Sequence, residues 1–450
     1  MNNLSYLTSD LPEDIKNLVT IGNFEEANKL IDIYLNRNIS SMLKDRLIFE
    51  KHRMNILKRE YPYNYDEALN LLQDRIDDLT KEEFNTLKLQ RYMDWIFVDG
   101  RIMFHKNFYS NILKVNQNIK NRLKNRNSEK ESTLLDDTVN DIISKGEKKY
   151  FIHLKTGIEL KDEGTRIGEK LRVYIPIPQN ADQIKNIKIL NTSHEISYIS
   201  PESYPQRTIY FETEVKGRDK FTVEYSYENH IKYNELDYDN VSNIQPVFHT
   251  EEWPPHIVFT PFLVDLANEI VGCETNPLKK ARKIYDYITK NVQYSYVRPY
   301  QAILNIAEYC AYNLKGDCGV QALLFITLCR IAGIPARWQS GLYVNPEYIG
   351  CHDWANIYVE PYGWLFADPS FGGGAYRNKN EKRWNFYFGN LDPFRMVANS
   401  EFQYDLLPEK KFLRSDPYDN QVGEVEYFDK AIQDGEGFEP IMEIVDVHEI

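Results

Sequence analysis

The sequence predicts a multidomain protein with an N-terminal all-α helical domain, a central β-sandwich and a C-terminal α+β domain. Three observations lead to this prediction. The chain has 450 residues, which is more than one hydrophobic core usually holds. Helical periodicity dominates its first third, and strict alternation of apolar and polar residues replaces it afterwards. We place the domains at residues 1–148, 149–250 and 251–450.

The first domain is predicted from apolar residues spaced three and four positions apart. Phe24, Ala27 and Ile31 fall on one face of a helix in this way. Aromatic residues gather at residues 92–109, where packed helix core is the preferred interpretation and a partner groove the alternative. A polar, charged run at residues 121–131 predicts the linker that ends the domain.

The second domain is predicted from segments with a period of two, the period of a strand with one buried face. Turn residues separate these segments, as expected for a β-sandwich. The predicted strands cover residues 170–178, 184–190, 207–215 and 220–228.

Charge and cysteine content limit the classes of partner and the compartment. With 54 Lys and Arg against 67 Asp and Glu, the net charge is −13, so nucleic acid is not an expected partner. Neither a membrane span nor a secretory signal is recognisable. Five cysteines without paired spacing argue against disulfides and a zinc site. We therefore expect a cytoplasmic protein that does not bind membranes.

A candidate nucleophile stands at the start of a predicted helix. The pattern indicates a helix at about residues 318–332, preceded by Gly316 and ended by Gly333 and Pro335. Cys318 is its first residue. The free N–H groups and the dipole at a helix N-terminus favour an anion, so we expect the pKa of this thiol to be lowered.

Two predicted strands downstream carry a histidine and an aspartate. The strands at residues 351–359 and 364–368 are joined by a turn, and pairing of Glu360 with Trp364 is the expected register. Side chains of equal parity then share a face, so His352 and Asp368 should emerge together. An imidazole beside a carboxylate forms the base and the orienting group of a catalytic triad.

The third domain resembles the core of the transglutaminase-like superfamily. The matching elements occur in the family's order, and several ordered segments together are far more specific than any one alone. They are Gly316-Asp-Cys318, Arg330-Ile-Ala-Gly-Ile-Pro-Ala-Arg337, His352-Asp-Trp354 and Gly363-Trp-Leu-Phe-Ala-Asp-Pro369.

This resemblance implies a papain-like α+β core and a cysteine enzyme. It implies that Cys318 is the nucleophile, His352 the general base and later the acid, and Asp368 the residue that orients the imidazole. Two positions depart from the family pattern: Asp353 stands where a small residue is usual, and Asn356 where an acidic residue is common. These departures concern the choice of substrate.

Further residues are candidates for substrate binding. Trp338, Trp354 and Trp364 could line an acyl-binding cleft, and aromatic packing around the strands is the alternative. Gly372 and Gly373, with the next glycine, could form a mobile lip over the cleft or a flexible turn.

The oxyanion of an acyl-transfer intermediate needs hydrogen-bond donors. The backbone N–H of Cys318 is the expected first donor, because it points out of the helix terminus. Tyr294, Tyr296 and Tyr312 are candidates for the second.

The remaining reactive side chains are interpreted as structural. Cys329 lies on the apolar face of the predicted helix, and strand parity points Cys351 into the core. The acidic stretch at residues 415–426 lacks the spacing of a calcium loop and is interpreted as solvated surface. No metal site and no cofactor are expected.

The sequence therefore predicts a thiol hydrolase, a peptidase or amidase that acts on peptide-type amide bonds of a peptide or protein substrate. One alternative is a true transglutaminase that joins glutamine to lysine side chains. The other is an interaction protein that binds a protein partner through its helical domain and has a vestigial core.

Overall fold

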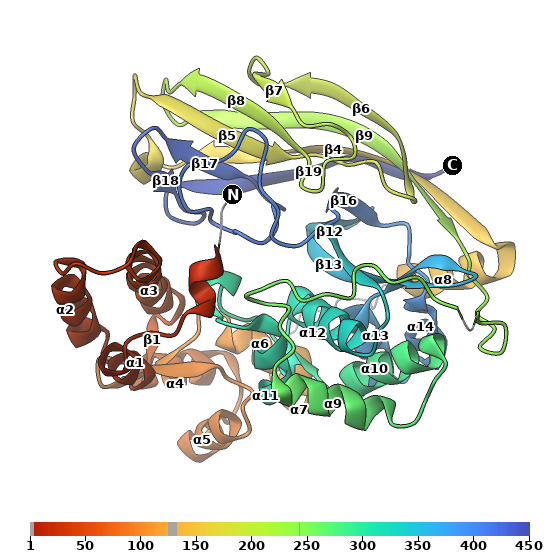
Figure 1. The fold of residues 1–450 in the computed structure, drawn as a ribbon, viewed down its shortest axis with the longest axis horizontal. Coiled ribbons are helices and arrows are strands. Elements are labelled where there is room, and N and C mark those ends of the chain that lie inside the picture. Colours follow the sequence, from red (N-terminus) through yellow and green to blue (C-terminus); the bar gives the residue numbers. More distant parts are fainter. Residues whose placement is uncertain (1–3, 125–132, 243) are drawn as a thin grey trace.

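The computed structural model describes residues 4–124, 133–242 and 244–450. Two sheets lie along one side of the molecule, and the helices of the third predicted domain lie on the other (Figure 1). A further sheet with β12, β13 and β16 lies between them, and the N-terminal helices pack beside this arrangement. Most of the predicted linker at residues 121–131 lies outside the described residues.

The N-terminal segment is mainly helical but not all-α. Its helices are α1 (Glu13–Thr20), α2 (Phe24–Leu35), α3 (Ser41–Glu60), α4 (Tyr65–Arg75), α5 (Lys81–Leu89), α6 (Phe108–Val115), α7 (Gln117–Asn121) and α8 (Leu134–Lys145). Three short strands form one sheet: β1 (Tyr63–Asn64), β2 (Trp95–Val98) and β3 (Arg101–Phe104).

The all-α prediction is thus wrong at residues 92–109. The run was interpreted as packed helix, but most of it is a hairpin, with Trp95 paired to Phe104 around a turn at Asp99 and Gly100. Aromatic side chains suit a pleated surface, and Gly100 has the positive φ that such a turn needs. The expectation that these aromatic residues pack into a core is met by Phe104, which is fully buried in an N-terminal hydrophobic cluster.

The two-sheet region contains the four predicted strands and several more. One sheet has the order β18-β17-β5-β8-β7, and the other β19-β4-β9-β6. All pairings in both sheets are antiparallel. The strands are β4 (Glu147–Leu160), β5 (Lys170–Pro176), β6 (Ile184–Thr192), β7 (Tyr198–Ile199), β8 (Thr208–Glu214), β9 (Lys220–Lys232), β17 (Glu424–Tyr427), β18 (Ala431–Ile432) and β19 (Phe438–Glu449).

The last three strands correct the predicted boundary between the second and third domains. Residues 251–450 were assigned to one domain, yet β19 pairs with β4 along most of its length and β17 pairs with β5. The end of the chain therefore completes both sheets. The alternation of residues within a strand does not reveal which distant strand it pairs with, so the sequence could not indicate this boundary.

The remaining elements form a helical layer against a five-stranded sheet of order β15-β14-β13-β12-β16. The helices are α9 (Pro261–Val271), α10 (Pro277–Asn291), α11 (Ile306–Asn313), α12 (Cys318–Ile331), α13 (Pro369–Arg377) and α14 (Glu381–Phe386). The strands of the sheet are β12 (Ala336–Asn345), β13 (Tyr348–Val359), β14 (Gly363–Ala367), β15 (Phe388–Gly389) and β16 (Arg395–Asn399), and β10 (Gln293–Tyr294) pairs with β11 (Lys315–Gly316).

One hydrophobic cluster runs from the two-sheet region into this layer. It includes Ile152 and Phe211 of the two sheets together with Leu324 of α12 and Ile357 of β13. The N-terminal helices bury most of their apolar side chains in two clusters of their own. The N-terminal segment is thus the more separate part of the molecule.

Candidate active site

Helix α12 begins at Cys318, as the sequence predicts. The side chain of Asp317 caps the helix and accepts a hydrogen bond from Val320 N at 3.1 Å. Gly316 precedes the cap, and a Cβ there would meet Cγ1 of Val320 at 2.3 Å, so a larger residue would push the helix away. Residues 319–330 of the helix are buried, and Cys318 stays partly exposed.

Strands β13 and β14 bring His352 and Asp368 together. His352 Nε2 and Asp368 Oδ2 are hydrogen-bonded at 2.7 Å. The expected register is wrong by two residues, since Trp364 pairs with Tyr358 instead of Glu360. A shift of two preserves parity, so the two side chains still share a face of the sheet.

Asp368 is held by an ion-pair network that the sequence reasoning missed. The Arg395 guanidinium lies 3.2 Å from Asp368 and 2.7 Å from Asp392, and all three side chains are fully buried. Burial raises the pKa of Asp368, but His352 and Arg395 outweigh it and hold this pKa below its usual value. Arg395 lies in β16, which pairs with β12 on the far side of β13, so no local pattern could indicate it.

Both ring nitrogens of His352 have assignable roles. An ionised Asp368 can only accept, so Nε2 carries the proton and Nδ1 is left as an acceptor. Burial lowers the pKa of His352, although Asp368 acts in the opposite direction. The imidazole is therefore neutral near pH 7 and able to take a proton.

The immediate partner of Cys318 is a carboxyl group. Its thiol donates a hydrogen bond to Asp353 Oδ2 at 3.2 Å, and Asp353 Oδ1 accepts from Gln421 Nε2 at 2.6 Å. Tyr300, which was not predicted, donates its hydroxyl to Asp317 Oδ1 at 2.7 Å and lies 3.5 Å from Asp353 Oδ2. Asp353 is the position where the family resemblance expects a small residue.

This environment reverses the predicted effect on the thiol. The burial of Cys318, followed by the charges of Asp353 and Asp317, raises the pKa of the thiol well above its usual value. The sequence argument considered only the helix terminus, which favours a thiolate. In the folded protein, burial and the charges of two aspartates oppose that effect.

The acidic stretch at residues 415–426 is not solvated surface. Asp419, Glu424 and Glu426 are almost fully buried. Burial raises the pKa of Asp416 to about 8, and burial together with Asp419 raises the pKa of Asp353 well above its usual value. The prediction is wrong because this segment folds inward between the two-sheet region and the active-site sheet.

Two of the predicted cleft tryptophans are core residues. Trp338 and Trp354 are 1% and 0% exposed, so a substrate cannot reach them. Trp354 stacks on His352 with ring centroids 6.0 Å apart. Trp364 lies at the opposite end of β14 from Asp368 and packs on Arg337.

The glycines after Asp368 form neither a lip nor a turn. Gly372 and Gly373 are buried within α13, for which Asp368 is the N-cap. A Cβ on Gly372 would meet the Tyr285 hydroxyl at 1.8 Å. The glycine is therefore needed because α13 packs closely against α10.

The predicted oxyanion tyrosines separate in the structure. Burial raises the pKa of the Tyr294 phenol. The charge of Cys318 acts in the same direction, so the two side chains lie near each other. Tyr296 packs edge-on against Tyr294. Tyr312 is 58% exposed and stacks on Phe262 of α9, away from the residues that contact Cys318.

The N-terminal segment holds the loop that follows β10. Asn111 of α6 donates to Tyr296 O at 3.0 Å and accepts from Tyr296 N at 2.7 Å. Asp94 lies 3.4 Å from the Arg298 guanidinium. This loop carries Tyr300, so the N-terminal segment contacts the active site through it.

A cavity of about 510 Å³ adjoins the residues around Asp353. Cys351, Gln421 and Asp419 are among its lining residues, and Gln421 is the partner of Asp353. Cys351 is exposed there, which contradicts the predicted burial in the core. Cys329, in contrast, is fully buried on α12 as predicted.

Comparison with known proteins identifies the class of this core. Residues 264–369 match the profile of the transglutaminase-like superfamily, which confirms the resemblance for that segment. The segment extends from α9 to the first residue of α13 and contains Cys318, His352 and Asp368. This part of the chain is therefore similar to a transglutaminase-like core.

Individual relatives are more distant. An uncharacterized protein of Haemophilus influenzae (strain ATCC 51907 / DSM 11121 / KW20 / Rd) is 26% identical over 193 residues, and the match covers 34% of this chain and 50% of the relative. The chain thus spans about half the length of this curated relative.

Solved structures are similar at low identity. A candidate cysteine protease from Cytophaga hutchinsonii has a TM-score of 0.40 and 15% identity, over 68% of this chain and 90% of that chain. The periplasmic domain of TgpA from Pseudomonas aeruginosa has a TM-score of 0.29 and 13% identity, over 55% of this chain and 96% of that chain.

Two kinds of feature are absent from the described residues. No helix among them combines the length and apolarity that a membrane span needs. Within residues 4–124, 133–242 and 244–450, no group of three or more His, Cys, Asp or Glu side chains is arranged to hold a metal ion.

Proposed function

We propose that this protein is a cysteine-dependent acyl-transfer enzyme, a thiol hydrolase that cleaves peptide-type amide bonds. Cys318 is the nucleophile, His352 the general base and acid, and Asp368 the orienting carboxylate. The observation that carries the proposal is the 2.7 Å bond between His352 and Asp368, together with the 3.2 Å bond from the Cys318 thiol to Asp353, the residue that follows His352. A buried carboxylate on an imidazole, near a partly exposed thiol, is the arrangement that activates a nucleophile.

The first chemical step forms a thioester. The Cys318 thiol leaves its hydrogen bond with Asp353 and gives its proton to His352 Nδ1, while Asp368 stabilises the imidazolium through Nε2. The sulfur then attacks the amide carbon. The backbone N–H of Cys318 and the Tyr294 hydroxyl are the proposed donors to the oxyanion. The amine departs with the proton from His352.

The second step transfers the acyl group to water. His352 Nδ1 takes a proton from the water, whose oxygen attacks the thioester carbon, and the thiol leaves with that proton. A primary amine in place of water would give a new amide bond, which is the chemistry of a transglutaminase. Water is proposed as the acceptor in this enzyme.

Organisation and location complete the proposal. The N-terminal segment acts as a helical domain that can recruit a protein partner, and the two-sheet region acts as a β-sandwich that supports the core. We propose the cytoplasm as the compartment, which agrees with five cysteines that are all free.

Labelling with an iodoacetamide probe and mass spectrometry tests the nucleophile. We expect Cys318 to be labelled in the wild type and the rate to fall in His352→Ala. Cys273→Ala is the matched control, because Cys273 is exposed outside the site and its loss should leave Cys318 labelling unchanged. Equal labelling of Cys318 in wild type and His352→Ala contradicts the proposed base.

A peptide library, incubated with and without a primary amine, tests the reaction. We expect hydrolysed peptides that are absent with Cys318→Ala. Amine incorporation without hydrolysis would instead indicate the transglutaminase. No reaction of any peptide, together with unreactive Cys318, would contradict an enzyme.

A further inference from the structure

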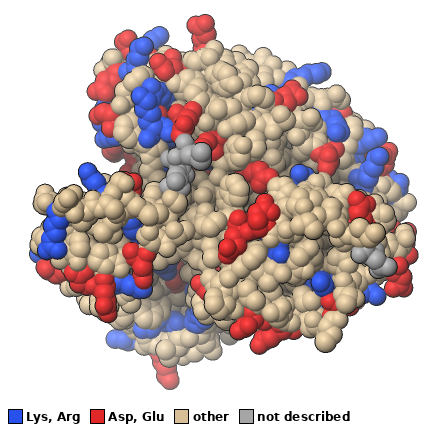
Figure 2. Space-filling model, in the orientation of Figure 1, with Lys and Arg blue, Asp and Glu red and all other residues tan. Residues whose placement is uncertain are grey.

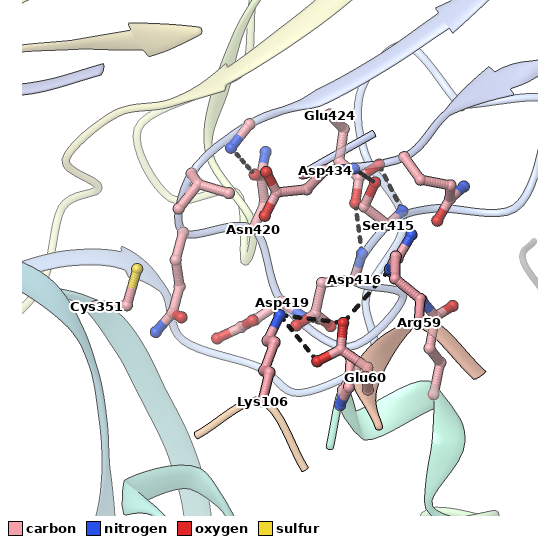
Figure 3. Close-up of a pocket in the computed structure, with 17 residues that line it drawn as sticks. Arg59, Glu60, Lys106, Cys351, Ser415, Asp416, Asp419, Asn420, Glu424 and Asp434 are labelled. Carbon is pink, nitrogen blue, oxygen red and sulfur yellow. Dashed lines mark hydrogen bonds and ion pairs between the residues drawn. The ribbon is translucent and has the colours of Figure 1, made fainter. Parts of the chain in front are cut away.

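The cavity beside Asp353 is built by distant parts of the chain. Arg59 and Lys106 come from the N-terminal segment, Cys351 from β13, and Asp416 and Asp419 from the segment before β17 (Figure 3). On the face seen in Figure 2, the surface is hollowed between the N-terminal helices and the two-sheet region. At about 510 Å³, the cavity is large enough for an amino-acid side chain.

Two of its carboxylates already have partners. Glu60 forms ion pairs with Lys106 at 2.8 Å and with Arg59 at 3.4 Å. Glu424 accepts hydrogen bonds from Ser415 N and Asp416 N, and Lys410 lies 3.6 Å away. The cationic side chains that line the cavity are therefore engaged by other residues.

Three other carboxyl groups on the wall have no cationic partner. Among the described residues, no Lys, Arg or His nitrogen lies within 4.0 Å of a carboxylate oxygen of Asp416, Asp419 or Asp434. Asp419 is 2% exposed, and its Oδ2 is buried without a hydrogen-bond partner in the part of the chain that the structure describes. A buried carboxylate oxygen without a donor is costly, which points to a ligand that supplies one.

We infer that this cavity binds an ammonium or guanidinium group, with Asp419 as the principal acceptor and Asp416 and Asp434 as further acceptors on the wall. Such a cation donates several hydrogen bonds to carboxylates and suits a wall of aspartates that form no ion pair among the described residues. Pro299 and Val422 also line the cavity and offer apolar surface to an aliphatic stem. The ligand is therefore a lysine-like or arginine-like group rather than a small ion.

The location connects this site to the chemistry. Asp353 contacts the Cys318 thiol with one oxygen and Gln421 of the cavity wall with the other. A basic group bound at Asp419 thus lies one side chain away from the nucleophile. As a statement about substrate choice, the inference rests on the proposed function. The site would select substrates with a basic side chain or a free amine near the reacting carbonyl.

Binding can be measured without catalysis in full-length Cys318→Ala. Isothermal titration calorimetry with agmatine, which carries both a guanidinium and an amine, should give a saturable signal. Asp419→Asn should weaken it about tenfold or more, because a buried charge partner is lost. Asp265→Asn, which removes the same charge from the exposed face of α9, is the matched control and should bind as the parent does.

Cys351 reports where the ligand sits, because it is exposed on the cavity wall. In Cys318→Ala, agmatine should slow maleimide labelling of Cys351 and leave the exposed Cys273 unaffected. If Asp419→Asn does not fold, Asp434→Asn serves instead, since Asp434 is only partly buried. The inference is overturned if agmatine gives no signal, if Asp419→Asn and Asp434→Asn both bind as tightly as the parent, or if calcium chloride alone protects Cys351.

Two arms distinguish the source of the cation. A short peptide with a central arginine, compared with the same peptide carrying citrulline, tests a side chain of a substrate. Putrescine, compared with n-butanol, tests a free amine. Protection of Cys351 by the arginine peptide or by putrescine supports the cation site, and equal protection by the neutral analogues overturns it. An inactive wild type that still binds agmatine would reject the proposed enzyme and keep the site.

Discussion

Asp368 and Asp353 lie at the same site, and their pKa values are shifted in opposite directions. Asp368 contacts His352 and Arg395, and its pKa is below the usual value despite complete burial. Asp353 contacts the Cys318 thiol and forms no ion pair with a Lys, Arg or His among the described residues, and burial raises its pKa well above the usual value. Burial is the largest influence on both carboxyls, and it acts in the same direction.

The difference shows that the neighbours decide the role. An ionised Asp368 orients and stabilises an imidazolium. The raised pKa of Asp353 favours its neutral form, which accepts the thiol hydrogen bond without forcing a charge onto the sulfur. If Asp353 ionised, it would oppose a Cys318 thiolate at 3.2 Å. One side of the site is ready for proton transfer, and the other holds the nucleophile in its neutral form.

The largest effect is expected from Asp368→Asn. The amide keeps the shape but cannot stabilise the imidazolium or fix its tautomer, so kcat should fall about 10²- to 10⁴-fold. Hydrolysis of the best peptide from the library measures it. Asp392→Asn is the control, since Asp392 contacts Arg395 and not His352. An unchanged kcat in Asp368→Asn would contradict the role given to this carboxylate.

Arg395→Met would remove the cation that distinguishes Asp368 from Asp353. Two buried carboxylates would lose their partner, so the free energy of unfolding should fall by about 3–5 kcal/mol. Urea denaturation measures the loss. Arg166→Met breaks a surface pair with Asp429 and should cost less than about 1 kcal/mol. A loss for Arg395→Met no larger than for Arg166→Met would show that the buried network does not stabilise the fold.

Asp353→Ala would remove the carboxyl group beside the thiol. The pKa of Cys318 should fall, and each unit of decrease raises the thiolate fraction about tenfold at a pH below both values. Iodoacetamide labelling of Cys318 as a function of pH measures the shift. Asp353→Asn keeps a hydrogen-bond acceptor without a titratable charge, so it separates the two contributions. Slower labelling in both variants would contradict the inhibiting role of Asp353.

The smallest effect is a pH dependence of stability from the unpaired carboxyls. The pKa of Asp416 is about 8 in the folded protein against 3.8 ordinarily, so the folded state holds a proton that the unfolded state lacks between these values. Stability from this group is complete below the ordinary pKa and is lost as the pH rises towards about 8. The Tm of Asp416→Asn minus the Tm of wild type should therefore be more positive at about pH 8 than at about pH 5.

Asp416→Asn retains the Oδ1 that accepts from Tyr418 N and Asp419 N, so the turn should survive. Thermal denaturation followed by circular dichroism at both pH values gives the comparison. An equal Tm difference at the two pH values would show that Asp416 is ionised in the folded protein.

Local patterns predicted much of the fold around the site. The start of α12 at Cys318 follows from a glycine, a capping aspartate and an apolar helix, all within a few residues. The common face of His352 and Asp368 follows from strand parity, and it survives a register error because the error is of two residues. These properties depend on neighbours in sequence, so the sequence alone determines them.

The charge states were decided by tertiary structure. Arg395 reaches Asp368 from another strand, and residues 415–426 fold inward to place Asp419 near Asp353. The final strands complete two sheets by pairing with strands that lie far earlier along the chain. The sequence by itself determined which residues could do chemistry. Only the folded chain decided which of them are charged, because desolvation and Coulomb interactions depend on groups that are distant in sequence and adjacent in space.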